Sequence, residues 1–190
     1  MANATLNRRQ LLTYLGLGTI ALGTTIACQS QSQTAIPRLA QAKAQPSGPR
    51  LPEFRGIEQW INSPALSIDD LQGQVTLIHI WTFACINCQR TIPSIVQWHR
   101  KYASQGLKVV SIHTPEFAFE RDINNVKKAV QKHDITYPVA IDNRFTMWKA
   151  YNNEYWPHLF LADRSGIIRY DHIGEGAYDT TEQTIQRLLG

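Results

Sequence analysis

The chain has 190 residues, a formal net charge of +4 and 43% hydrophobic residues, which is the composition of one globular domain with additional segments. The charge is uneven, because all 15 acidic residues and 14 of the 19 basic ones lie after residue 50. The basic excess therefore belongs to the first 50 residues. Since binding of nucleic-acid phosphates needs Lys and Arg clustered on a folded surface, this distribution argues against nucleic acid as a partner.

The first 28 residues have the pattern of an export signal. Arg8 and Arg9 precede an uncharged, moderately apolar stretch that runs from residue 11 to Cys28. The paired arginines resemble a twin-arginine signal, and the end of the stretch, "TIAC", resembles a lipoprotein cleavage site in which Cys28 carries a lipid anchor. Thr25 departs from the Leu that is usual there, and the alternative is an uncleaved signal anchor. Either arrangement predicts that the rest of the chain is extracytoplasmic and attached to a membrane.

Residues 29–50 are rich in Gln, Ser, Ala and Pro and show no apolar periodicity. This composition predicts a flexible linker. Residues 51–190 are enough for one well-packed domain.

Strands and helices alternate along this domain. In chain order, we expect a strand at 75–81, a helix from the cysteines to Gly106, a strand at 107–113, a helix around 123–133, a strand at 137–141, a helical turn at 145–151, two strands at 158–163 and 167–173 joined by a tight turn, and a last helix opened by a capping box at 179–182. The order predicts an α/β fold, with a central mixed sheet flanked by helices on both faces and an antiparallel hairpin at one edge.

The pair Cys85 and Cys88 is the main chemical motif. Cys85 falls at a junction from strand to helix, where unpaired N–H groups and the helix dipole favour a thiolate. Cys88 lies one turn later on the same helix face, within disulfide range. Pro93 follows inside the helix, which it is expected to kink without ending it. The spacing fits a pair that forms and breaks a disulfide.

Two other interpretations of the pair remain open. A structural zinc site needs four ligands, and His79 and His113 lack the spacing to complete one. A structural disulfide across so short a loop adds little stability. Both are weaker interpretations than a redox pair.

The stretch "IHIWTFACINCQRTIP", residues 78–93, resembles the active-site segment of thioredoxin-fold proteins. The segments "WTFACINC", "HTPEFAFE", "YNNEYWP" and "GEGAY" resemble the TlpA/ResA-like branch, and above all the thioredoxin-like domain of DipZ-type proteins. The resemblance covers about residues 51–190. It implies a thioredoxin fold and an extracytoplasmic thiol–disulfide oxidoreductase that needs no cofactor. DipZ-type proteins also carry a membrane electron-transfer domain, so the resemblance implies a membrane partner of the CcdA/DsbD type.

The resemblance also implies roles for single residues. Cys85 matches the solvent-facing nucleophile, and Cys88 matches the buried resolving thiol. Pro157 matches the family's cis-proline, which lies against the disulfide and docks substrate backbone. Trp156 before it is expected to face the substrate, with a core aromatic as the alternative. Glu116 matches a carboxylate near the cysteines that can relay the proton of Cys88, with a solvated loop residue as the alternative.

Three further residues flank the pair. Trp81 matches the family tryptophan near the active site and is expected to contact the substrate, and Phe83 is either a substrate contact or a core residue. His79 stands where thioredoxins have a buried Asp. An imidazole there can take a proton near pH 7, although a lone His in a buried strand is more often a core residue.

The function expected from these features is reduction of disulfide-bonded protein substrates by dithiol exchange. One alternative is a Cu(I)-binding module that uses the two thiolates with His79 or His113. Another is a peroxiredoxin-like peroxidase, which needs its reactive cysteine in a different loop context.

Overall fold

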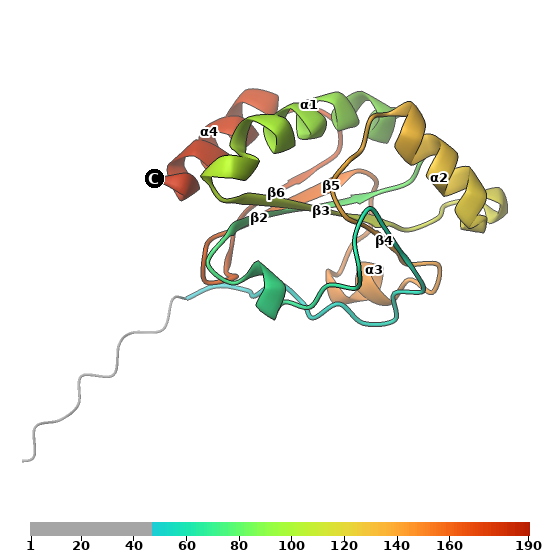
Figure 1. The fold of residues 1–190 in the computed structure, drawn as a ribbon, viewed down its shortest axis with the longest axis horizontal. Helices are drawn as coiled ribbons and strands as arrows, with labels where there is room; N and C mark the ends of the chain where they lie inside the picture. Colours follow the sequence, from blue (N-terminus) through green and yellow to red (C-terminus); the bar gives the residue numbers. More distant parts are fainter. Residues whose placement is uncertain (1–46) are drawn as a thin grey trace, which may run out of the picture. The chain divides into compact units, whose positions relative to one another are not determined.

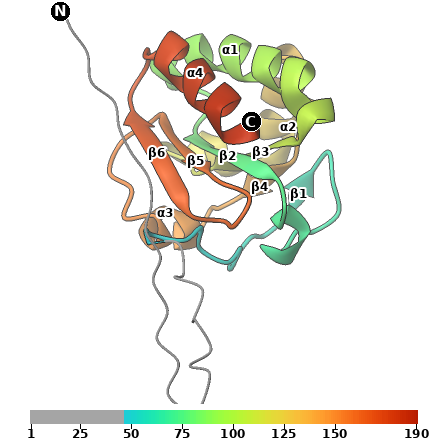
Figure 2. The ribbon, with the colours of Figure 1, turned by 90° about the vertical axis from the view of Figure 1, so that its left-hand side faces the viewer.

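A six-stranded mixed sheet organises residues 47–190, the part of the chain that the computed structural model describes (Figure 1). The strands lie in the order β1-β4-β3-β2-β5-β6 (Figure 2). The central strand β2 pairs in parallel with β3, which pairs in parallel with β4, and the other neighbours are antiparallel. The strand bounds are β1 Trp60–Ile61, β2 Val75–Trp81, β3 Leu107–His113, β4 Val139–Ile141, β5 His158–Ala162 and β6 Ile168–Ile173.

Helices cover both faces of this sheet. One face carries α1, α2 and α4, and the other carries α3 together with residues 51–71 (Figures 1 and 2). The helix bounds are α1 Ile86–Tyr102, α2 Ile123–Lys132, α3 Thr146–Ala150 and α4 Tyr178–Leu189, and short 3-10 turns occur at Asp69–Leu71, Ala103–Gln105 and Ala118–Arg121. The predicted thioredoxin-type α/β fold, with helices on both faces and an antiparallel hairpin at one edge, is confirmed.

The mostly apolar sequence of β2 follows from its place between two cores. Because successive side chains of a strand point to opposite faces, Leu77 and Trp81 pack toward α1, whereas Ile78 and Ile80 pack toward α3. All seven residues of β2 are buried, as expected for a parallel strand covered on both faces. The end of β2 is therefore a rigid support for the cysteines that follow it.

Helix α1 runs through Pro93 from Ile86 to Tyr102. Its buried face includes Cys88, Ile92 and Ile95, which join the core above β2. Burial of these side chains compensates for the backbone hydrogen bond that a proline cannot donate. The helix therefore continues past Pro93, as the sequence predicts.

The predicted capping box at the start of the last helix is wrong. Helix α4 begins at Tyr178, and Ala177, in a left-handed conformation with φ 49°, occupies the capping position. Asp179 lies inside the first turn, where its charge still favours the helix dipole. The hydroxyl of Thr181 donates to the carbonyl of Ala177 at 2.9 Å and does not cap an N–H group.

Two segments lie differently from the expectation. Residues 47–50, at the end of the predicted linker, pair with the sheet edge, since the N–H of Ile168 donates to the carbonyl of Pro49 at 2.8 Å. Strand β1 was not predicted, because it has only two residues. The predicted export signal and Cys28 lie outside the described residues. Between residues 47 and 190, no helix is long and apolar enough to cross a membrane.

Candidate active site

Cys85 lies where β2 gives way to α1. It occupies the N-cap position of α1 in an extended conformation, and its carbonyl accepts the hydrogen bond from the N–H of Gln89 at 3.0 Å. Cys88 lies in the first turn of α1 and is completely buried, whereas Cys85 is partly exposed. Both are free thiols. The predicted junction therefore gives one accessible and one buried sulfur.

The two thiols differ strongly in acidity. A hydrogen bond from Cys88 lowers the pKa of Cys85 to about 6, although burial and the charge of Glu116 oppose this. Burial raises the pKa of Cys88 far above its usual value, and its hydrogen bond to Cys85 raises it further. At neutral pH the site therefore holds a Cys85 thiolate beside a Cys88 thiol. Since the thiolate is the nucleophile, the arrangement favours attack by Cys85.

A loop from the opposite side of the sheet completes the surroundings of Cys85. The Trp156–Pro157 peptide bond is cis, and the carbonyl oxygen of Trp156 lies 3.9 Å from Sγ of Cys85. The carbonyl of Pro157 accepts a hydrogen bond from the N–H of Gly174 at 2.8 Å. The structure thus brings together three segments that are distant in the sequence: the cysteine loop, the Trp156–Pro157 loop and the end of β6.

The side chain of Trp156 is held by a hydrogen bond and by packing against another tryptophan. Its indole Nε1 donates to the carbonyl of Thr114 at 3.0 Å, and its ring packs against Trp148 with centroids 4.2 Å apart. Buried Asp142 sets the position of Trp148, since its carboxylate accepts hydrogen bonds from the N–H groups at the start of α3 and from the hydroxyl of Thr114. Asp142 and Thr114 are supporting residues that the sequence analysis missed.

Glu120 is another residue that the sequence analysis missed. Its buried carboxylate accepts hydrogen bonds from the hydroxyl of Thr82 and from the N–H groups of Ala84 (2.9 Å), Glu116 (2.7 Å) and Phe117 (2.8 Å). Burial raises the pKa of Glu120, but these hydrogen bonds outweigh burial and hold the pKa below its usual value. The carboxylate fastens the loop before Cys85 to the loop after β3. Glu120 is the last residue of the segment "HTPEFAFE", so this motif is the sequence signal that could have pointed to it.

Glu116, the carboxylate chosen from the sequence, lies on the exposed loop after β3. Its charge raises the pKa of Cys85, whereas the charge of Glu120 raises the pKa of Cys88. Of these two carboxylates, Glu116 is exposed and Glu120 is buried and hydrogen-bonded.

His79 lies on β2 and is completely buried, on the same face of the sheet as Leu77 and Trp81. Its Nδ1 lies 3.4 Å from the hydroxyl of Ser111, and its ring stacks on Trp81 with centroids 6.0 Å apart. Burial lowers the pKa of His79 to about 3. A neutral imidazole of that pKa is a weak base at pH 7, so the geometry disfavours a direct proton transfer to His79.

The two aromatic residues beside the cysteines differ in accessibility. Trp81 is completely buried and packs edge-on against His113 at 5.3 Å, so it supports the site from beneath and does not reach a substrate. The predicted substrate contact by Trp81 is therefore not supported. Phe83 is partly exposed and stacks on His113, with centroids 5.6 Å apart. Phe83 remains available as a contact surface.

Several large apolar side chains are exposed near the cysteines. Among residues 47–190, the exposed large hydrophobic side chains are Ile86, Phe117, Phe119, Tyr155 and Ile173. Each belongs to, or directly adjoins, one of the segments that surround Cys85. Clustered exposed apolar side chains mark a surface that contacts another molecule. This distribution fits a protein substrate better than a small polar one.

No three His, Cys, Asp or Glu side chains in the described residues are arranged to hold a metal ion. His79 and His113 thus do not join the cysteines in a common ligand set. The copper-delivery alternative gains no support from the geometry.

The acidity of Cys85 gives a direct test. The rate of alkylation of Cys85 is expected to follow its thiolate, with a midpoint near pH 6, so that alkylation slows as the pH falls through that value. In Cys88→Ala the midpoint should rise toward that of an ordinary thiol, because the largest cause of the lowered pKa is gone. Cys88→Ser keeps a hydrogen-bond donor and should shift the midpoint less. An unchanged midpoint in Cys88→Ala would contradict the assigned cause.

Comparison with known proteins agrees with this site. Residues 48–171 match the model of the AhpC/TSA family. The chain is 43% identical to protein DipZ of Mycobacterium tuberculosis over 141 residues, which is 73% of this chain but only 20% of DipZ. It is 30% identical to the thiol-disulfide oxidoreductase YkuV of Bacillus subtilis over 139 residues, 73% of this chain and 93% of YkuV.

A solved structure described as a thioredoxin-like protein in the oxidized form superposes with a TM-score of 0.68 at 30% identity, over 74% of this chain and 94% of the other. The family model covers most of the described domain, and the YkuV match spans nearly a whole oxidoreductase. The chain therefore belongs to the AhpC/TSA family. Its domain, with a partly exposed and a buried cysteine next to a cis-proline, is a thioredoxin-like thiol–disulfide oxidoreductase.

Proposed function

We propose that this protein reduces disulfide bonds of protein substrates outside the cytoplasm, and that a membrane protein of the CcdA/DsbD type returns it to the dithiol form. The observation that carries the proposal is the placement of the two free cysteines, with Cys85 partly exposed at the start of α1 and Cys88 completely buried. This placement goes with a lowered pKa of Cys85 and a raised pKa of Cys88. The pKa of Cys85, about 6, is nearer to the value of about 7 in thioredoxin than to about 3.5 in the strong oxidant DsbA. That comparison supports the reducing direction.

The proposed reaction has two exchange steps. The thiolate of Cys85 attacks one sulfur of the substrate disulfide, forming a mixed disulfide and releasing the other substrate sulfur as a thiolate. Cys88 then loses its proton and attacks Sγ of Cys85. The Cys85–Cys88 disulfide forms, the second substrate thiolate leaves, and two electrons have passed from the enzyme to the substrate.

The N-terminal pattern and the DipZ relationship support the location and the electron source. The chain spans about a fifth of DipZ, so the function of that whole protein does not carry over to it directly. The export-type signal, with Cys28 or the uncleaved segment as the anchor, would keep the domain near a membrane partner. An anchored domain meets that partner at a high effective concentration.

We propose Glu116 as the acceptor of the proton from Cys88. Glu116 is exposed on the loop after β3, so it can pass a proton to solvent, and its charge acts on Cys85. Glu120 already accepts four hydrogen bonds, which make its carboxylate a poor base. Buried His79 is a weak base for the reason given above.

The matched variants Glu116→Gln and Glu120→Gln separate the two carboxylates. Glu116→Gln should slow the Cys88 step by about tenfold or more near pH 7, since it removes the base, and leave the free energy of unfolding nearly unchanged. Glu120→Gln should instead lower the free energy of unfolding by about 2 kcal/mol, because at least two buried donors lose their acceptor. Single-turnover kinetics and urea unfolding measure these effects. A wild-type rate at every pH in Glu116→Gln would rule out its role.

The roles of the cysteines are tested by trapping. Cys88→Ala should accumulate a mixed disulfide between Cys85 and a substrate protein, because the resolving thiol is missing. Cys85→Ala should accumulate none, because Cys88 is buried and protonated. Non-reducing electrophoresis of the full-length protein detects the adduct. Equal trapping by both variants would show that the roles are assigned wrongly.

The direction of electron flow is tested by the reduction potential. Equilibration of the protein with glutathione buffers should give a potential below about −200 mV, on the reducing side of protein disulfide isomerase. A potential near the value of about −120 mV found in DsbA would overturn the reducing direction, although thiol–disulfide exchange would stand.

A further inference from the structure

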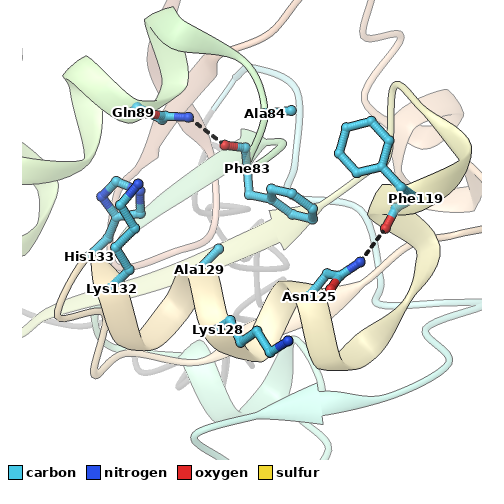
Figure 3. Close-up of a pocket in the computed structure, with 9 residues that line it drawn as sticks. All are labelled: Phe83, Ala84, Gln89, Phe119, Asn125, Lys128, Ala129, Lys132 and His133. Atoms are coloured by element: carbon cyan, nitrogen blue, oxygen red, sulfur yellow. Dashed lines mark hydrogen bonds between the residues drawn. The ribbon is translucent and has the colours of Figure 1, made fainter.

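A groove between α1 and α2 opens beside the nucleophilic cysteine (Figure 3). Phe83 and Ala84, the two residues before Cys85, form part of its wall, so one end of the groove adjoins the nucleophile in the chain. Its volume is about 500 Å³. The lining residues are Phe83, Ala84, Gln89, Phe119, Asn125, Lys128, Ala129, Lys132 and His133. This groove lies beside the site and takes no part in the exchange steps described above.

The lining combines aromatic rings with positive charge. Phe119 is 54% exposed, stands edge-on to Phe83 at 5.8 Å between centroids, and stacks on the neighbouring Phe117 at 5.7 Å. Lys128 and Lys132 lie one turn apart on α2, and both line the groove (Figure 3). No acidic residue lines it, and within residues 47–190 neither ammonium group forms an ion pair.

Side-chain amides fix the two walls of the groove. Nε2 of Gln89 donates to the carbonyl of Phe83 at 2.8 Å, which ties the cysteine loop to α1. Nδ2 of Asn125 donates to the carbonyl of Phe119 at 3.0 Å, which ties the loop after β3 to α2. Both bonds are drawn in Figure 3. A groove held in shape in this way loses little entropy when a ligand binds.

We propose that this groove binds the segment of a substrate protein that flanks its disulfide, and that it selects a segment with an acidic residue next to an apolar side chain. The inference rests on the attack by Cys85 proposed above, because that attack brings the substrate chain to the mouth of the groove. The rings of Phe83 and Phe119 then pack against the apolar side chain, and Lys128 and Lys132 pair with the carboxylate. The positive charges of the lining, unpaired within residues 47–190, and the position of Ala84 next to Cys85 point to this occupant.

The test compares disulfide peptides that differ only in the flanking segment. One peptide carries Glu next to Leu, and the second carries Lys next to Leu. For each, kcat/KM is measured with the full-length protein at low ionic strength, with dithiothreitol as the reductant that returns the Cys85–Cys88 disulfide to the dithiol form. The acidic peptide should be preferred. In Lys128→Glu/Lys132→Glu the ratio of acidic to basic kcat/KM should fall by about tenfold or more, the effect expected of two partly exposed ion pairs. Added salt should reduce the wild-type preference.

Lys127→Glu is the matched control. Lys127 lies on the same helix and is exposed, but it does not line the groove, so this variant should keep the wild-type ratio. Equal kcat/KM for the two peptides in the wild-type protein, or a wild-type ratio in the double variant, would overturn the proposed selection. Lys127→Glu changes the net charge by −2 and the double variant changes it by −4. A change in the logarithm of the ratio half as large as in the double variant, or larger, would therefore overturn the proposal too, because the effect would then come from overall charge.

Failure of the underlying chemistry gives a different result. Hydroxyethyl disulfide is small and neutral and has no flanking segment, so its reduction reports on the thiols alone. If Cys85→Ser still reduces it at the wild-type rate, the proposed attack by Cys85 fails, and the groove proposal fails with it. If Cys85→Ser is inactive while the wild-type protein does not distinguish the peptides, only the groove proposal fails.

Discussion

The chemistry of this protein depends on the effect of Cys88 on Cys85, whose pKa Cys88 lowers to about 6 by hydrogen bonding. This effect requires that the two cysteines be held one helical turn apart, Cys85 partly exposed and Cys88 in the core. Buried strand β2 fixes the start of that turn, and the packed face of α1 fixes Cys88. Stabilisation of a thiolate at neutral pH is thus a consequence of where a strand ends and a helix begins.

Two buried carboxylates hold the loops around this thiol pair. Glu120 fastens the loop before Cys85 to the loop after β3, and Asp142 fastens the start of α3 below Trp148. Each carboxylate accepts hydrogen bonds from several backbone N–H groups. A buried loop has no regular backbone acceptors for these groups, so the carboxylates supply them. Neither carboxylate contacts the reacting atoms. Together they nevertheless determine the positions of Phe117, Trp156 and the residues next to them.

Much of this fold could be predicted from the sequence because its signals are local. The apolar runs of β2 and β3, the C-x-x-C pair at a junction and the turn between β5 and β6 each depend on neighbouring residues. The supporting carboxylates depend instead on contacts between residues distant in the sequence, such as Glu120 with Thr82, which no local pattern records. The same limit explains why the sequence pointed to Glu116 and not to Glu120. The two residues share one motif, and only their different burial in the folded protein distinguishes them. The predicted capping box was wrong because the helix begins after Ala177, whose left-handed conformation cannot be read from the sequence pattern "DTTE".

The burial of Cys88 has a consequence for oxidative stress. Among the described residues, only the sulfur of Cys85 is open to oxidants in solution, and it is the more acidic of the two thiols. Oxidation of a thiolate first gives a sulfenic acid, which condenses with a neighbouring thiol to form a disulfide and water. The neighbour here is always Cys88. The first product of oxidative damage is thereby converted into the Cys85–Cys88 disulfide, a form from which the domain can be reduced again.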